Sequence, residues 1–417
     1  MHTVGPRGSC EVGAPCEEVK VMSALAIRPE QQRLVELVRE FVTRVVTPVA
    51  AELDRRPNPE DCFSWQIVEE ASRVGIRTLT LKEEYGGAGA DSLTTAMVIE
   101  ELAKGDLGVS VIFAQTLKIA QTLQRACTVE QAKRFIPSYA DNPRGLLAIA
   151  ITEPDTSSNY IIPYDDPHYP FRTTAVRRNG AWTLNGVKHF ISNGNRAMLY
   201  LVFAQTDSTK GLVEGSTCFL VPRETPGFSI GRVHDKMGER LVNNAELIFQ
   251  DCRLTDDEVL GEVGKGFDIL VQFFPASNAY AAASVLGVAE AAYERTLRWA
   301  RERVQGGRRL IDHDTTGEDL AEMRMLIDAA RAYVRQAAYT ADHREFWDPT
   351  LGALPKVFAS RVAWHVVTKA MELHGGFGYM RETGVEKLVR DAAAFLHSDG
   401  ANRSLLLKAA RFIRRAA

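Results

Sequence analysis

Residues Trp182–Gly194 read WTLNGVKHFISNG, and this stretch decides how the rest of the chain is interpreted. Asn-Gly pairs stand inside it at Asn185-Gly186, at its end at Asn193-Gly194, and just before it at Asn179-Gly180. Asn and Gly tolerate the positive φ angles of tight primed turns. The stretch therefore predicts short antiparallel strands joined by hairpins.

The spacing of apolar residues changes on both sides of this stretch. Between Pro29 and about Leu147 they recur at three- and four-residue steps, which is typical of helices. The same period returns at Gly266 and persists toward the C-terminus. The strands expected between the two helical zones are Trp182–Leu184, Val187–Ile191, Leu199–Ala204, Cys218–Val221 and Glu246–Phe249.

These zones predict an α+β fold class in four segments. We expect a disordered leader over residues 1–24 and an N-terminal helical domain over 25–147. A central antiparallel β domain should cover 148–258, and a C-terminal helical bundle 259–417.

Composition narrows the class of protein. Lys and Arg total 50 against 53 Asp and Glu, and this balance argues against a nucleic-acid binder. No apolar stretch reaches the ~18 residues of a membrane span. The cysteines are far apart and form no CxxC pair, so we expect reduced thiols, no metal centre and a cytoplasmic protein. They lie at Cys10, Cys16, Cys62, Cys127, Cys218 and Cys252.

Several familiar catalytic motifs are absent from the sequence. It contains no HExxH, no GxSxG and no P-loop, because Gly264-Lys265-Gly266 lacks the Ser or Thr that follows the lysine. No GxGxxG opens a βαβ unit, which argues against a Rossmann nucleotide site. The nine histidines show no metal-ligand spacing.

Five segments, taken together and in this order, resemble the acyl-CoA dehydrogenase superfamily of flavoproteins over residues 25–417. The first three are Glu83–Gly89 (EEYGGAG), Ile151–Pro154 (ITEP) and Leu184–Gly194 (LNGVKHFISNG). The fourth is Asp235–Gly238 (DKMG), with Leu260–Phe267 (LGEVGKGF) downstream. The fifth is Leu373–Tyr379 (LHGGFGY), followed by Val385–Lys387 and Arg390–Ala392.

The resemblance implies an FAD site between the β domain and the late helices. It places Ile151 and Thr152 against the flavin ring, Phe190 over its face, and the Ser192 hydroxyl near flavin N5. Arg303 and Ser158 would meet the pyrophosphate. Glu372, Gly375 and Gly376 would approach the FAD of a neighbouring subunit. Taken singly, these residues could also be core aromatics, surface charges and helix caps.

The resemblance also implies the chemistry. Its general base aligns with Asp399, one methylene shorter than the usual Glu, with Gly400, Ser277 and Asn278 near the substrate. The implied reaction is α,β-dehydrogenation of an acyl-CoA thioester, with hydride passing to FAD and then to an electron-transferring flavoprotein. A homotetramer or dimer is implied as well. Alternatively, Asp399 caps a helix.

Some positions depart from the family pattern. The loop after Pro154 loses two glycines and gains Asp155, and Gly306 stands where an aromatic is usual, before Gly307. Nitroalkane oxidases resemble the chain in their Asp base and in a DGxN run like Asp399–Asn402. Two alternatives therefore stay open: a nitroalkane-oxidase-like enzyme, and a catalytically silent partner subunit of a hetero-oligomer.

Overall fold

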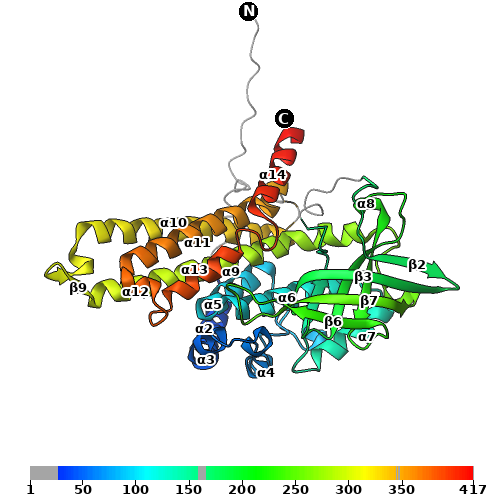
Figure 1. Cartoon of the computed structure of the whole chain (residues 1–417), viewed down its shortest axis with the longest axis horizontal. Helices are drawn as coiled ribbons and strands as arrows, with labels where there is room; N and C mark the ends of the chain where they lie inside the picture. Colours follow the sequence, from blue (N-terminus) through cyan, green and yellow to red (C-terminus); the bar gives the residue numbers. More distant parts are fainter. Residues whose placement is uncertain (1–26, 158–165, 344, 346–347, 417) are drawn as a thin grey trace, which may run out of the picture.

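The computed structural model describes residues 27–157, 166–343, 345 and 348–416. A β-sheet lies at one end of the molecule and a bundle of long helices runs away from it to the other end (Figure 1). The leader expected over 1–24 falls outside the described residues.

The N-terminal domain is helical, as the apolar period predicts. Its helices are α2 (Pro29–Phe41), α3 (Thr47–Asp54), α4 (Trp65–Arg73), α5 (Ser92–Gly105), α6 (Leu107–Ala126) and α7 (Val129–Ala140), with a π-helical turn at Val42–Val46 between α2 and α3. Side chains of Asp91 and Asp106 accept hydrogen bonds from the backbone N–H groups of Thr94 and Val109. These N-caps explain where α5 and α6 begin.

The central domain is one mixed sheet with the order β6-β7-β3-β2-β4-β5-β8. Its strands are β1 (Leu147–Ala150), β2 (Thr174–Arg178), β3 (Ala181–Ser192), β4 (Leu199–Gln205), β5 (Ser216–Pro222), β6 (Phe228–Val233), β7 (Asn244–Leu254) and β8 (Val259–Leu260), with the short helix α8 (Leu212–Gly215) before β5. Most neighbours are antiparallel, as expected, but β1 and β2 both pair with β4 in parallel.

The Asn-Gly pairs do not all form turns. Asn179-Gly180 makes the hairpin turn between β2 and β3 with φ angles of 51° and 76°, and Asn193-Gly194 ends β3. Asn185-Gly186, however, lies inside β3 at a register shift in its pairing with β7. A Cβ on Gly186 would lie 2.5 Å from the Cα of Thr173, so glycine there allows a close backbone approach.

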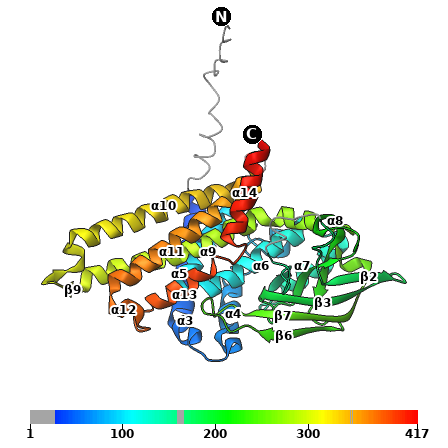
Figure 2. The ribbon, with the colours of Figure 1, turned by 45° about the horizontal axis from the view of Figure 1, so that its top comes forward.

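The C-terminal helices are α9 (Gly266–Glu302), α10 (Asp314–Asp342), α11 (Leu354–His374), α12 (Gly376–Tyr379), α13 (Val385–Ala394) and α14 (Asn402–Ala416). Between α9 and α10 lies a small hairpin, β9 (Val304–Gln305) with β10 (Arg308–Arg309). In both views α14 stands out from the bundle, while α9 runs from the bundle to the sheet (Figures 1 and 2).

Helix α9 joins the two halves of the molecule. It is long and apolar enough to cross a membrane, but 83% of its apolar window is buried inside the protein. Its alanine-rich faces pack in one continuous core with α5, α6, α10 and α11. This burial identifies α9 as the central core helix. The order of the elements confirms the predicted helix–sheet–helix fold class.

Candidate active site

A cavity of about 630 Å³ lies where the sheet, α6, α9 and the loop after α13 meet. We call it the central cavity. Strand β3 contributes Phe190 and Ser192 to its wall, the segment after β1 contributes Thr152, and the helices contribute Lys118 and Ser277. Asp399 and Gly400 close it from the loop between α13 and α14.

Asp399 is held in an unusual backbone conformation. Its φ angle is 49°, in the left-handed region that non-glycine residues adopt at a cost of roughly 1–2 kcal/mol. Its carboxylate is 20% exposed and lies 3.1 Å from Nζ of Lys118. Strain of this kind persists only where the surroundings fix it, and it gathers at functional sites.

Lys356 fixes the loop that carries Asp399. Its buried ammonium donates to the carbonyl oxygens of Phe395 (2.7 Å) and Gly400 (2.8 Å) and to Oδ1 of Asn402 (3.1 Å). Burial lowers the pKa of Lys356 to about 7, although the nearby Asp399 carboxylate opposes the change. The three bonds hold both ends of the 395–402 segment.

The sheet wall is supported by a fully buried ion pair. Nζ of Lys188 lies 2.7 Å from Oε1 of Glu153 and also donates to the carbonyl of Ile151 at 3.0 Å. Burial lowers the pKa of Lys188 to about 8, and Glu153 opposes this. The pair joins β3 to the segment that presents Ile151 and Thr152 to the cavity, and the His189 N–H bonds the Thr152 carbonyl at 2.7 Å.

Phe190 suits a planar ring ligand. Its side chain is 57% exposed although it lines the central cavity, and its φ angle of 58° lifts it out of the regular strand. One face stacks on His189 at 4.0 Å. An exposed aromatic face beside Thr152 and Ser192 fits an isoalloxazine, since aromatic rings prefer stacked partners.

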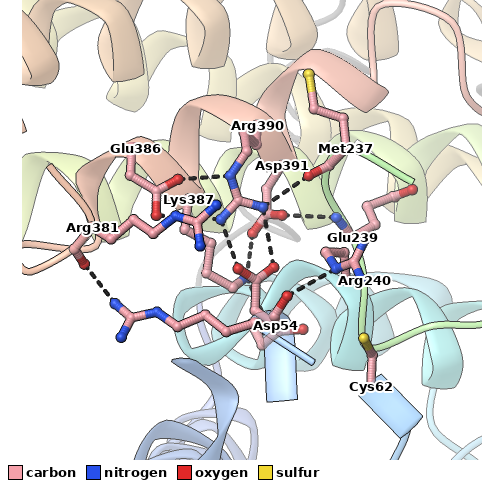
Figure 3. Close-up of polar contacts among 12 residues, drawn as sticks. Asp54, Cys62, Met237, Glu239, Arg240, Arg381, Glu386, Lys387, Arg390 and Asp391 are labelled. Carbon is pink, nitrogen blue, oxygen red and sulfur yellow. Dashed lines mark hydrogen bonds and ion pairs between the residues drawn. The ribbon is translucent and has the colours of Figure 1, made fainter. Parts of the chain in front are cut away.

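An ion-pair network, shown in Figure 3, lies beside the cavity and positions α13. Arg390 binds Asp54 of α3 at 2.6 Å and Glu386 at 2.6 Å. Lys387 lies between Asp106 (2.6 Å) and Asp391 (2.5 Å). Because α13 leads directly into the loop with Asp399, these pairs fix the direction from which the carboxylate enters the cavity.

Glu239 connects this network to the cavity. Its backbone N–H donates to Asp391 at 2.8 Å, and its side chain lines the central cavity near Lys236. Burial raises the pKa of Glu239 to about 7; Lys236 opposes this rise, and the carboxylates of Asp391 and Asp399 add to it.

A second cavity, of about 450 Å³, lies at the far end of the bundle near α12 and β9 (Figure 1). We call it the end cavity. It is lined by Arg303, Glu372, Gly375 and Gly376, with Phe377 over Arg303. Ser277 and Arg303 are 26 residues apart along α9 and its C-cap, which corresponds to roughly 40 Å. One chain therefore does not bring all the expected FAD residues together.

Three family models match the chain in sequence order. Acyl-CoA dehydrogenase, N-terminal domain, matches residues 28–143, the middle domain matches 148–252, and the C-terminal domain matches 264–413. The chain belongs to the acyl-CoA dehydrogenase family. It is thus an oxidoreductase of the type that acts on CH–CH groups, in a family that binds FAD.

Relatives in this family match over nearly the whole chain. The short-chain specific acyl-CoA dehydrogenase of Megasphaera elsdenii is 33% identical, over 90% of this chain and 96% of its own. The solved butyryl-CoA dehydrogenase of the same organism has a TM-score of 0.86 at 32% identity, covering 93% and 99% of the two chains. A structure described as electron transferring flavoprotein of Acidaminococcus fermentans also reaches 0.86, at 30% identity, covering 93% and 99%.

The two remaining residues of the expected site are not found among the described residues that line either cavity. Asn278 lines neither cavity; it is buried in α9, where its amide donates to the Gly352 carbonyl. Ser158 falls outside the described residues.

Sequence reasoning missed several residues of the site. Lys118 and Glu239 line the central cavity, and Lys356 lies behind it, but no motif used above contains Lys118 or Lys356. The nine histidines looked scattered, yet His189, His234 and Glu246 come together behind Phe190, with their ligand atoms within 4.8 Å of one another. Only the fold brings these three positions into one place.

Proposed function

We propose that the protein is an FAD-dependent acyl-CoA dehydrogenase that introduces an α,β double bond into an acyl-CoA thioester, with Asp399 as the base. The observation that carries this is the placement of Asp399 in the same cavity as Thr152, Phe190 and Ser192. A base must lie within reach of the proton before its pKa matters.

FAD, when bound, supplies the hydride acceptor for the β-hydrogen. Asp399 accepts the α-proton, so that the α C–H electron pair becomes the new double bond. The Asp399 backbone N–H is a candidate donor to the thioester oxygen as negative charge develops there. Ser192 and Thr152 orient the ring ligand from the sheet side, and Phe190 covers its face.

The side chain of Asp399 is one methylene shorter than that of Glu, and in this proposal the backbone position of Asp399 compensates for the shorter reach. The positive φ angle and the bonds from Lys356 fix the backbone on which the carboxylate stands. Gly400 follows with φ 99°, a conformation suited to glycine, and keeps the turn narrow beside the cavity.

A second copy of the chain completes the cofactor site in this proposal. Arg303, Glu372, Gly375 and Gly376 are too far from the central cavity to hold the same FAD, so they would contact the FAD of a neighbouring subunit in a homodimer or homotetramer. Ser158 would lie near the pyrophosphate. Reduced FAD would pass its electrons to an electron-transferring flavoprotein. The described cysteines are free thiols, in keeping with a cytoplasmic enzyme.

The test is the visible spectrum of the purified protein before and after anaerobic mixing with acyl-CoA thioesters and, separately, with small nitroalkanes. Bleaching of the flavin by thioesters is the expected result. Bleaching by nitroalkanes alone would replace the proposal with an oxidase. A protein that takes up no flavin after reconstitution would instead be a silent partner subunit.

Asp399→Asn tests the base directly. We expect the variant to retain flavin while bleaching slows on the order of 10³-fold, as when a general base is removed. Asp328→Asn is the matched control, because Asp328 is also ion-paired, to Arg324 and Arg331, but lies on α10 outside both cavities. Unchanged bleaching in Asp399→Asn would remove Asp399 from the mechanism.

A further inference from the structure

Lys118 is a buried cation in the wall of a cavity that should receive an acyl chain. Its side chain is 3% exposed, and it is the only charged residue among the buried side chains of α6. Nζ donates to Oδ1 of Asp399 at 3.1 Å and to Oγ of Ser277 at 3.0 Å, and it lies 5.1 Å from the centre of the Phe273 ring. An unsubstituted alkyl chain has no hydrogen-bond acceptor or negative charge for the Lys118 ammonium. Burying an ammonium costs free energy unless it is paired.

The reaction removes the anionic partner that Lys118 has among the described residues. When Asp399 accepts a proton it becomes neutral, and Lys118 is left as a buried cation without a counter-ion. The ion pair restrains the Asp399 carboxylate toward Lys118. A second anion near Nζ would take over the pairing and would free Asp399 for proton transfer.

The wall around Lys118 is equipped to bind such an anion. Gln115 lies one turn earlier on α6 and lines the same cavity, and its buried Oε1 has no hydrogen-bond partner among the described residues. The amide is free to present its NH₂ group instead. Lys118, Ser277 and Gln115 then supply three donors, which match the acceptor oxygens of a carboxylate.

The charged side chains that line the cavity do not oppose the binding of a further anion. Its lining carries three cationic side chains, Lys118, Lys236 and Arg390, against the two carboxylates of Glu239 and Asp399. Arg390 is already paired with Asp54 and Glu386. Burial raises the pKa of Glu239 to about 7 and lowers the pKa of its partner Lys236 to about 8, so this pair carries less charge of either sign near neutral pH.

We propose that the acyl group of the substrate carries a carboxylate, which binds Lys118, Ser277 and Gln115 and releases Asp399 from its ion pair. This inference rests on the proposed dehydrogenase function and narrows its substrate class to carboxylated acyl-CoA thioesters. Lys118 thereby both binds the substrate and positions the base.

The test compares two acyl-CoAs of equal carbon number, one ending in a methyl group and one in a carboxylate, by anaerobic flavin bleaching of the holoenzyme. We expect the wild type to be bleached by the carboxylated thioester on the order of 100-fold more efficiently, because a site built for a polar group rejects an analogue that lacks it. Lys118→Met should abolish or reverse this preference, Lys118→Arg should keep most of it, and Ser277→Ala should weaken it.

Lys104→Met is the matched control. Lys104 is also ion-paired, to Glu294 at 2.7 Å, but lies on α5 and lines neither cavity. Its variant should keep the wild-type preference. A wild type that prefers the methyl-terminated thioester, or a Lys118→Met variant that slows with both thioesters equally, would overturn the inference while leaving the dehydrogenase function intact. Failure of every thioester to bleach the flavin would instead reject the proposed function itself.

Discussion

The buried carboxyl groups of Glu153 and Glu239, near the central cavity, differ in the number of hydrogen-bond and ion-pair partners they have. Glu153 has Lys188 and two backbone donors, the N–H groups of Arg172 and Thr173. Burial alone would raise its pKa, but these partners outweigh burial and hold the pKa below its usual value. Among the described residues, the Glu239 carboxyl is paired with Lys236 at 3.9 Å, and burial raises its pKa to about 7.

Glu239 should make stability depend on pH. Between its ordinary pKa of 4.5 and about 7, the folded protein holds a proton that the unfolded chain releases, so the free energy of unfolding falls as pH rises through this window. Glu239→Gln removes the titration. We expect it to lose less stability than the wild type between pH 5 and pH 8, by up to about 3 kcal/mol, as measured by urea unfolding. Glu84→Gln, on the exposed surface, serves as control, and parallel pH curves for wild type and Glu239→Gln would contradict the assignment.

Single residues also mark the limit of what the sequence can predict. Asp399 could be predicted as the general base because it follows the matching motif Arg390–Ala392 at a fixed distance along the sequence. The role of Lys118 could not be predicted. Helix α6 is buried on every side, so the sequence shows no polar face from which a lysine in the site could be told apart from a solvated one. The separation of Lys118 and Asp399 by 281 residues hides their contact until the fold is known.

At the scale of elements, periodicity predicted the long helices well and the sheet less well. The helical period expected from Gly266 onward corresponds to α9 and α10, because apolar burial at a 3.6-residue period is a local property. Strand β3 was expected as two pieces around Asn185-Gly186. The pair forms a bulge instead, since pairing with β7 on both sides of it continues the strand.

The Lys188–Glu153 pair links β3 to the 151–153 segment. A double-mutant cycle should measure the coupling energy between these two side chains. Lys188→Met or Glu153→Gln alone leaves one buried group without its partner, which typically costs 3–5 kcal/mol. The double variant should cost less than the sum of the two, with a coupling energy of about 1–3 kcal/mol in urea unfolding. Both single variants should also weaken flavin retention, because Lys188 bonds the carbonyl beside Thr152.

The exposed pair Arg309–Asp312 provides the comparison for this cycle. Its side chains are largely in water, so the same cycle there should give a much smaller coupling energy than the cycle at Lys188 and Glu153. Strictly additive losses at Lys188 and Glu153 would mean that the two motifs are held together by packing alone.

At the scale of the whole molecule, the expected flavin residues divide between two places. The central cavity beside the sheet and the end cavity near α12 are separated by most of the length of α9, and α12 lies at the end of the bundle away from the sheet (Figure 1). The residues around the end cavity include large apolar side chains that are not buried in the core of the chain. Exposed apolar side chains cluster around it, with Phe377 46%, Tyr379 76% and Met380 50% exposed, which is typical of a surface that meets a partner.

Gly376→Val separates assembly of the cofactor site from stability of the chain. A Cβ on Gly376 would meet nothing within 4 Å in the chain, and the residue is not in a positive-φ conformation, so the urea midpoint should change little. If the FAD of a second copy lies against this surface, the side chain should obstruct it, and the flavin-to-protein ratio should fall several-fold. Gly317→Val is the matched control, because Gly317 is also an early helical residue with open space around its Cβ, but it is outside both cavities. Full flavin content in Gly376→Val would show that the end cavity takes no part in binding the cofactor.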